Sequence, residues 1–176
     1  GKQIARGAVD TMKRVTLELG GKSPNILLDD ADLETAIPQA VTAAYFNNGQ
    51  ACLAATRLIV PERRLEEVKM LVRKAVAAIK VGHPGDEDTM LGPLVTQKQY
   101  ERVQSYIRLG IEEGAELLTG GEGHPEGMDH GYFVKPTVFV NVTNDMRIAR
   151  EEIFGPVLSI IAYLTEEEAI DIANDT

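Results

Sequence analysis

The feature of this sequence that most constrains its fold is the alternation between short apolar runs and longer amphipathic segments. The short runs are rich in Val, Ile and Leu and have the length of β-strands, whereas the longer segments repeat apolar residues every three or four positions, as an α-helix does. Such alternation predicts an α/β fold of three layers, with a mostly parallel, twisted sheet covered by helices on both faces. The clearest helix covers residues 62–80, and its apolar face consists of Leu65, Val68, Leu71, Val72, Ala75 and Ile79.

The same patterns give approximate bounds for the other elements. Strands are expected at residues 15–19, 25–28, 57–60, 115–118, 136–142 and 156–163. Further helices are expected at residues 2–13, from Asp30 or Asp32 to about Asn47, from Thr96 to about Gly114, and from Thr165 onward. Thr165 is followed three residues later by Glu168, which predicts a capping box. Residues 81–95 and 120–131 are expected to be loops.

Composition excludes several classes of protein. The 176 residues suit one domain, and the net charge of −9 argues against a nucleic-acid or anionic-membrane partner. No apolar run has the length of a membrane span, and no signal-peptide pattern is present. The single cysteine rules out an internal disulfide and fits a reducing compartment, so we expect a cytoplasmic protein. The three histidines lack metal-ligand spacing, so no metal site is expected.

The strongest candidate for chemistry is Cys52, in the segment Phe46-Asn-Asn-Gly-Gln-Ala-Cys-Leu-Ala-Ala-Thr-Arg57. A lone cysteine is most often a small buried hydrophobic residue. Here, however, two Asn and a Gly predict a sharp turn just before it, and the small residues beyond it leave room for a substrate. A nucleophilic thiol needs a fixed turn, access, and a nearby group to manage its proton.

A second candidate is Glu18, in Leu17-Glu-Leu-Gly-Gly-Lys-Ser-Pro24. At the end of an apolar strand its carboxylate would be partly desolvated, which raises its pKa and suits it to act as a base. The alternative is an ordinary surface glutamate beside Lys22. A phosphate-binding loop is excluded, because Thr16 stands where that motif requires glycine.

A third segment, Glu151-Glu-Ile-Phe-Gly-Pro-Val157, places acidic and aromatic residues just before a strand. Glu152 could hold a ribose hydroxyl and Phe154 a flat ring. On spacing alone, a charged pair at a helix end followed by a core Phe is the better interpretation.

Taken together and in this order, the three segments resemble the signatures of the aldehyde dehydrogenase superfamily. The resemblance implies that Cys52 attacks the aldehyde, that its backbone N–H helps to hold the oxyanion, and that hydride leaves to NAD or NADP. Glu18 is then expected to activate the water that hydrolyses the thioester to a carboxylic acid. Glu152 and Phe154 are expected to contact the cofactor, and the backbone of Leu19 and Gly20 to lie near its carboxamide.

The resemblance also implies that the chain, residues 1–176, is a fragment of a catalytic domain. Members of the family carry an upstream dinucleotide-binding domain and a C-terminal strand that joins subunits into dimers or tetramers, and both are absent here. The aldehyde remains open, although Ala51 and Leu53 beside the nucleophile indicate an apolar or mixed one. Two alternatives stay open: cofactor-independent esterase chemistry by Cys52 and Glu18, and an inactive structural fragment.

Overall fold

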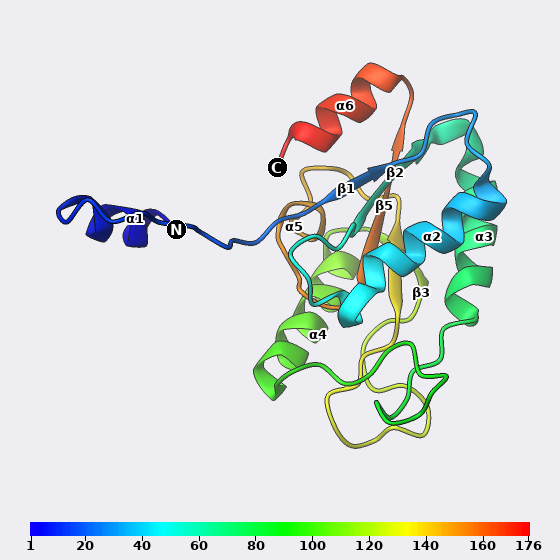
Figure 1. Cartoon of the computed structure of the whole chain (residues 1–176). Helices are drawn as coiled ribbons and strands as arrows, with labels where there is room; N and C mark the ends of the chain where they lie inside the picture. Colours follow the sequence, from blue (N-terminus) through cyan, green and yellow to red (C-terminus); the bar gives the residue numbers. More distant parts are fainter.

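The computed structural model describes all 176 residues and is built around one five-stranded sheet (Figure 1). The strands lie in the order β1-β2-β5-β4-β3, so the last strand of the chain occupies the centre. All neighbours pair in parallel except β3 and β4, which are antiparallel. The strands are β1 (Pro24–Ile26), β2 (Arg57–Pro61), β3 (Glu116–Thr119), β4 (Thr137–Val140) and β5 (Val157–Tyr163).

Six α-helices and two short 3₁₀ turns connect and flank these strands. Thr96 and Thr165 cap their helices as predicted, each hydroxyl accepting a hydrogen bond from the amide three residues later. The Glu168 carboxylate also turns back, but it accepts from the amide of Leu164, the residue before the cap, at 2.7 Å. The helical elements are α1 (Lys2–Val9), α2 (Leu33–Tyr45), η1 (Phe46–Gly49), η2 (Glu62–Arg64), α3 (Leu65–Ala77), α4 (Gln97–Glu112), α5 (Arg147–Arg150) and α6 (Glu166–Asn174).

The predicted three-layer architecture is confirmed by the way side chains alternate across the sheet. In β2, Leu58 and Val60 belong to the core beneath α2 and α3, while Ile59 between them packs with Ala169 of α6 on the other face. In β4, Phe139 points into the second core beneath α4 and α5. Because successive strand residues point to opposite faces, each strand serves two cores, and helices are needed on both sides.

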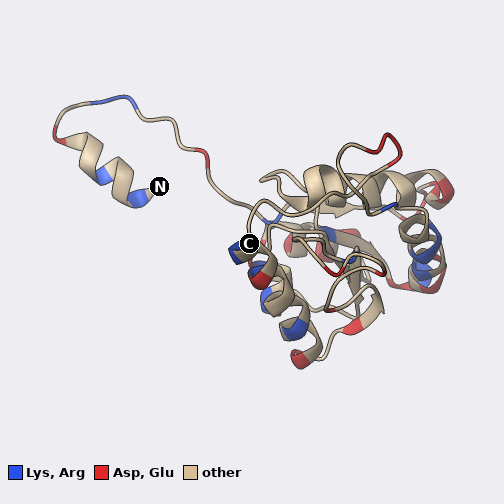
Figure 2. Cartoon of the chain, turned by 90° about the horizontal axis from the view of Figure 1, so that it is seen from below, with Lys and Arg blue, Asp and Glu red and all other residues tan.

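The predicted strand at residues 15–19 is wrong. These residues form an extended arm that pairs with no strand, and all of them are exposed. The arm connects the sheet to α1, which stands apart from the rest of the molecule in both views (Figures 1 and 2). Alternation of apolar residues was present, but a strand also requires a neighbouring strand to complete its hydrogen bonds, and none is available here.

Every helix of the structure is too short or too polar to cross a lipid bilayer.

Candidate active site

The three motifs meet because each of them immediately precedes a parallel strand. Gly20 and Gly21 lead into β1, Cys52 leads toward β2, and Glu152 leads toward β5. These strands are neighbours and run in the same direction, so their amino-terminal ends form one edge of the sheet. Segments far apart in sequence are thereby brought to a common place.

The turn before Cys52 has the sharp geometry that its residues predicted. Asn47 and Asn48 both adopt left-handed backbone conformations, with φ of 50° and 60°, and Gly49 follows with φ of 69°. Asn and Gly tolerate this region best. Gly49 also lies so close to the carbonyl of Gly155 that an added Cβ would overlap it, so the second and third motifs are in direct backbone contact.

Side-chain amides fix this turn to the loop that follows α3. The Asn48 side chain accepts from the amide of Gly92 at 2.9 Å and donates to the carbonyl of Pro93 at 3.3 Å. Gln50 accepts from the amide of Val95 at 3.2 Å. The turn is therefore held on one side by the segment that precedes β5 and on the other by the loop after α3.

Cys52 itself is exposed, and its thiol is the only one in the chain. Its backbone N–H makes no hydrogen bond within the chain, whereas the carbonyl of Ala51 accepts from Ala54 at 3.0 Å. A reachable sulfur next to an unused N–H donor is the arrangement that acyl transfer requires, since the donor can hold a developing oxyanion.

The glycine pair of the first motif lies between Cys52 and Glu152. A Cβ built on Gly21 would sit 3.3 Å from the carbonyl oxygen of Cys52, and the amide of Gly21 donates to the Glu152 carboxylate at 3.3 Å. At Gly20 an added Cβ would overlap that carboxylate. Because Gly20 has no side chain, the half-buried Glu152 carboxylate can lie directly against the backbone of Gly20 and Gly21.

Glu18 differs from expectation in its surroundings. Glu18 is exposed on the arm rather than partly desolvated at a strand end, and its carboxylate makes no hydrogen bond or ion pair in the chain. Leu19 is 58 % exposed. Both residues precede the glycine pair directly, so they adjoin the site, but the structure does not bring the Glu18 carboxylate into contact with Cys52.

Beneath the site lies a pair of buried cations that the sequence analysis did not single out. Lys22 is buried, and its amine has no hydrogen-bond partner. The pKa of Lys22 is lowered to about 7, first by burial and then by the nearby positive charge of Arg57, while the Glu152 carboxylate acts in the opposite direction. The Arg57 side chain donates to the Lys22 carbonyl at 2.9 Å, which ties β2 to the first motif.

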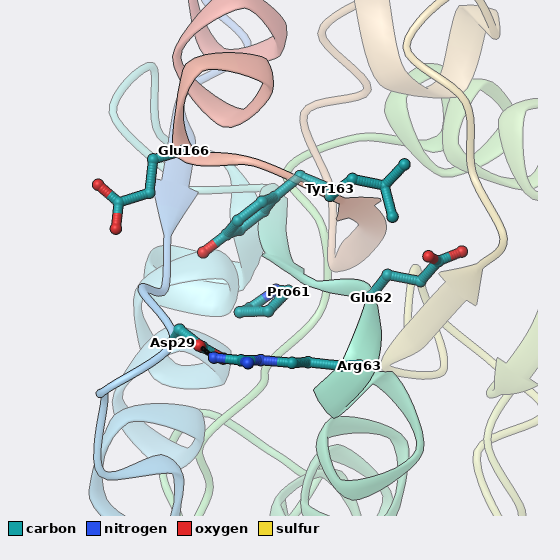
Figure 3. A pocket seen from close by; sticks show the side chains of 7 residues that line it. Asp29, Pro61, Glu62, Arg63, Tyr163 and Glu166 are labelled. Carbon is teal, nitrogen blue, oxygen red and sulfur yellow. Dashed lines mark hydrogen bonds and ion pairs between the residues drawn. The ribbon is translucent and has the colours of Figure 1, made fainter.

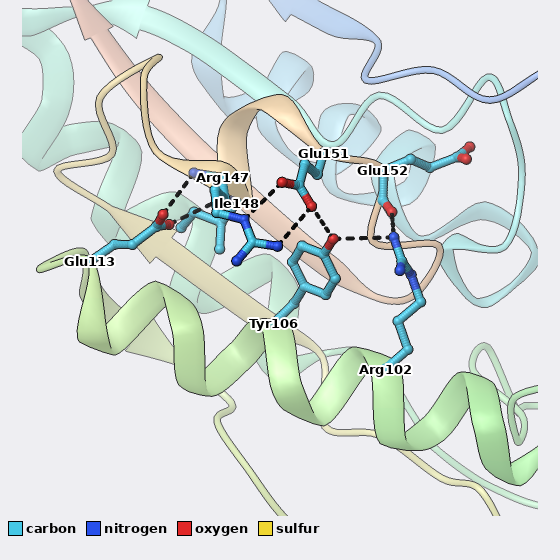
Figure 4. A network of polar contacts seen from close by, with 7 residues as sticks. All are labelled: Arg102, Tyr106, Glu113, Arg147, Ile148, Glu151 and Glu152. Atoms are coloured by element: carbon cyan, nitrogen blue, oxygen red, sulfur yellow. Dashed lines mark hydrogen bonds and ion pairs between the residues drawn. The ribbon is translucent and has the colours of Figure 1, made fainter.

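Phe154 adopts φ of 63°, and the loop that carries it is bound by side chains of α4. Arg102 donates to the carbonyl of Glu152 at 2.6 Å, and Gln99 donates to the carbonyl of Phe154 at 2.7 Å (Figure 4 shows Arg102 and Glu152). Sequence reasoning missed these α4 residues, because polar positions on an amphipathic helix look like solvated ones until the neighbouring loop is known.

A separate hollow of about 450 Å³ lies at the opposite, carboxyl-terminal edge of the sheet (Figure 3). Arg63 in it is paired with Asp29, and the Tyr163 hydroxyl donates to the Leu27 carbonyl at 2.9 Å. Three of its polar side chains, Asp29, Arg63 and Tyr163, are therefore satisfied within the chain. The lining residues are Asp29, Pro61, Glu62, Arg63, Tyr163, Leu164 and Glu166. No group of three or more His, Cys, Asp or Glu side chains in the molecule is placed to hold a metal ion.

The chain matches the model of the aldehyde dehydrogenase family over residues 1–176. The chain belongs to this family. Among curated aldehyde dehydrogenase relatives, the 3-succinoylsemialdehyde-pyridine dehydrogenase of a Pseudomonas species is 52 % identical over 176 residues, which is 100 % of this chain and 37 % of that protein. The chain therefore spans little more than a third of the length of the relatives it matches.

Solved aldehyde dehydrogenases share the fold. A Cys-to-Ala variant of aldehyde dehydrogenase C from Pseudomonas syringae, in complex with NAD⁺ and octanal, is 54 % identical with a TM-score of 0.96 and matches over 99 % of this chain and 36 % of its own. An aldehyde dehydrogenase from Mycobacterium tuberculosis in complex with NAD⁺ is 52 % identical with a TM-score of 0.95, at the same coverage.

Proposed function

We propose that this chain is the catalytic segment of an NAD(P)⁺-dependent aldehyde dehydrogenase that oxidises an aldehyde to a carboxylic acid, with Cys52 as its nucleophile. The single observation that carries the proposal is the convergence of three sequence motifs on one sheet edge, where an exposed thiol stands beside an unused N–H donor. Membership of the aldehyde dehydrogenase family supports the same assignment.

In the first step, the Cys52 thiolate attacks the carbonyl carbon of the aldehyde. A C–S bond forms, and the carbonyl electron pair moves onto oxygen. The free N–H of Cys52 lies next to the sulfur along the chain and is proposed to donate to that oxyanion. The rigid Asn-Asn-Gly turn keeps sulfur and N–H in a fixed relation, which spares the cost of ordering them during the reaction.

Glu18 is proposed as the base of the second step. When Cys52 carries an acyl group as a thioester, a water molecule must attack the acyl carbon, lose a proton and expel the thiolate. Glu18 is three residues from Gly21, which lies against Cys52, and its carboxylate is free of other partners. Because it sits on an extended arm, it can approach the acyl group by movement of the arm alone.

A nicotinamide cofactor is proposed to bind at the same edge of the sheet. When bound, NAD(P)⁺ supplies the acceptor for the hydride that the adduct on Cys52 must lose. Glu152 is proposed to accept hydrogen bonds from the ribose hydroxyls, and Phe154 to pack beside the nicotinamide. Gly20 allows the Glu152 carboxylate to lie here, since any side chain at position 20 would displace it. Leu19 and Gly20 offer backbone groups at the same place.

The substrate is proposed to be an apolar aldehyde. Leu53, the neighbour of Cys52, is 67 % exposed and lines a shallow, mainly apolar hollow of about 610 Å³. Exposed apolar walls of this kind select a substrate by burial of hydrocarbon surface rather than by charge. The walls of the hollow are Pro38, Gln39, Thr42, Ala43, Phe46 and Leu53.

The test is the reactivity of the single thiol. Alkylation of Cys52 should be faster than that of a free cysteine at neutral pH, and its pH profile should be compared with that of Glu18→Gln. Both proteins should also be assayed with an aryl ester, with and without NAD⁺. Ester cleavage that is lost in Cys52→Ser would assign nucleophilic chemistry to Cys52. If Cys52 alkylates like a model thiol and no ester is cleaved, the catalytic proposal is wrong.

We further propose that residues 1–176 form only part of the catalytic unit. The dinucleotide-binding domain, and a C-terminal strand that joins subunits into a homodimer or homotetramer, would be supplied by the rest of a longer protein. The exposed apolar residues of α1 and the arm, among them Ile4, Val9 and Met12, support this arrangement, since they need a covering partner. A cytoplasmic location is proposed from the unpaired cysteine.

A further inference from the structure

The loop that carries Glu152 and Phe154 has a conformation that its own residues do not favour. Phe154 has φ of 63°, a region that a bulky aromatic residue rarely occupies. Such a conformation persists only when the surrounding structure imposes it. The cause must therefore lie in contacts made with the loop from outside.

Those contacts come from three side chains on one face of α4. Gln99 donates from a single amide nitrogen to the carbonyls of Ile153 and Phe154, at 2.9 and 2.7 Å. Arg102, one turn further along, donates to the carbonyl of Glu152 at 2.6 Å. Three consecutive carbonyls of the loop are thus bound by two side chains, which fixes the backbone on both sides of the unfavourable residue.

Tyr106, one turn beyond Arg102, connects this binding to the base of the loop (Figure 4). Its hydroxyl donates to the Glu151 carboxylate and accepts from Arg102 at 3.2 Å. Glu151 is held from its other side by Arg147 at 2.8 Å. Tyr106 is buried, so its hydroxyl has a fixed position from which to orient both charged partners.

We propose that Gln99, Arg102 and Tyr106 form a clamp on α4 whose role is to position the Glu152 carboxylate against Gly20 and Gly21. The effect extends beyond the loop, because the Glu152 carboxylate is the group that accepts from the amide of Gly21. The clamp joins α4 to the first motif, 131 residues away along the chain from Glu152. The importance of the clamp for cofactor binding rests on the proposed function. The contacts that form the clamp are independent of that function.

The test compares two matched substitutions on the same helix. Tyr106→Phe removes the hydroxyl that links Arg102 and Glu151. Tyr100→Phe is the control, because the Tyr100 ring stacks on His124 and its hydroxyl makes no hydrogen bond. The probe is the amide of Gly21 in this chain, followed by NMR shift and hydrogen exchange. Tyr106→Phe should move the resonance of the Gly21 amide and speed its exchange by about fivefold, the factor expected when the hydrogen bond from Gly21 to Glu152 is lost. Tyr100→Phe should leave both unchanged.

A second pair tests Arg102 and distinguishes positioning from general destabilisation. Arg102→Met should reproduce the change at Gly21, and Arg102→Lys, which keeps a donor, should restore much of the wild-type signal. The amide of Gly92, bonded to Asn48, serves as the internal reference and should not respond. The clamp is refuted if Gly21 fails to respond in Tyr106→Phe, or if Gly92 responds to the same extent.

These readouts need neither aldehyde nor cofactor, so failure of the clamp and failure of the proposed activity can be told apart. Alkylation of Cys52 should keep its wild-type rate in Tyr106→Phe, because the clamp acts on Glu152 and not on the thiol. A changed alkylation rate would mean that Tyr106 acts on the whole site and would contradict the specific role given to the clamp.

Discussion

Arg57 is the largest wholly buried side chain of the molecule, and its guanidinium joins three parts of the fold. It donates to the carbonyl of Lys22, to the side chain of Asn144 and to two carbonyls at the end of α6. Replacement by Leu would leave these buried and partly buried acceptors without the Arg57 donor. We expect Arg57→Leu to lower the free energy of unfolding by roughly 3 kcal/mol or more, measured by urea denaturation.

The control for this substitution is Arg63→Leu. Arg63 is also in an ion pair, with Asp29, but its side chain is 74 % exposed, so its loss should cost less than about 1 kcal/mol. Equal effects of the two substitutions would show that the buried hydrogen bonds of Arg57 contribute little.

Lys22 predicts a dependence of stability on pH. Its pKa is about 7 in the folded chain, because burial disfavours the ammonium, against 10.5 as its ordinary value. Between these two values the unfolded chain binds more protons, so stability rises with pH; below about 7 the contribution is constant and unfavourable. Lys22→Met should remove this dependence, and its stabilising effect should be larger at pH 6 than at pH 9 by about 3 kcal/mol.

Denaturation curves at the two pH values, with the exposed Lys13→Met as reference, check this expectation. Parallel pH profiles for the wild type and Lys22→Met would mean that the amine finds a partner and stays charged.

Glu151 should make the stability of the chain depend on pH in the acidic range. Pairing with Arg147 and the hydrogen bond from Tyr106 lower the pKa of Glu151 to about 2. The contribution of this pair is present above the ordinary carboxyl range and is lost as pH falls toward 2. Glu151→Gln should therefore lower the thermal stability of the chain at pH 6 but have almost no effect on it near pH 2. Thermal unfolding at the two pH values measures this difference. A difference that grows on acidification would contradict this assignment.

Single residues also mark the limit of what the sequence predicted about the site. The turn before Cys52 followed from Asn and Gly, whose conformational preferences are local. The surroundings of Glu18 did not follow, since its exposure depends on whether another strand lies beside the arm. The contacts of Gln99 and Tyr106 were equally out of reach, because they join α4 to a loop some 50 residues away.

Among the elements, α1 is the one without tertiary support. None of its eight residues is buried. Isolated helices shorter than about 12 residues are marginal in water, so α1 should be largely unfolded in this chain on its own. Hydrogen exchange should show fast amides in residues 2–9 and slow ones in α4, whose apolar face is buried. Deletion of residues 1–9 should change the free energy of unfolding by less than about 1 kcal/mol; strong protection of α1 would disprove this.

Helices and strands with buried faces were predicted well, because periodicity records burial directly. Helices α2, α3, α4 and α6 and strands β2 and β5 lie within a few residues of their expected positions. The failure at residues 15–19 arose where alternation occurred without burial. Sequence patterns also gave no means to tell that β3 pairs antiparallel to β4, because direction depends on how the chain returns to the sheet.

For the whole molecule, we expect that the isolated chain keeps a reactive Cys52 thiol but does not oxidise an aldehyde. The chain carries Cys52 and Glu18 but spans little more than a third of its relatives. NADH formation from octanal, followed by absorbance at 340 nm, should be negligible for the isolated chain. Thiol alkylation at Cys52 should remain measurable in the same sample, and steady turnover by this chain alone would show that no further domain is needed.

The order of strands has a consequence for how the chain matures during synthesis. Because β5 lies between β2 and β4, a growing chain that stops before Val157 holds two half-sheets with nothing to join them. Each half would expose unpaired backbone N–H and C=O groups along one edge until β5 has been synthesised. Such exposed strand edges promote association with other chains. Termination of synthesis near residue 150 would therefore yield an aggregation-prone chain. Chaperone binding to the nascent chain should be strongest just before β5 emerges from the ribosome.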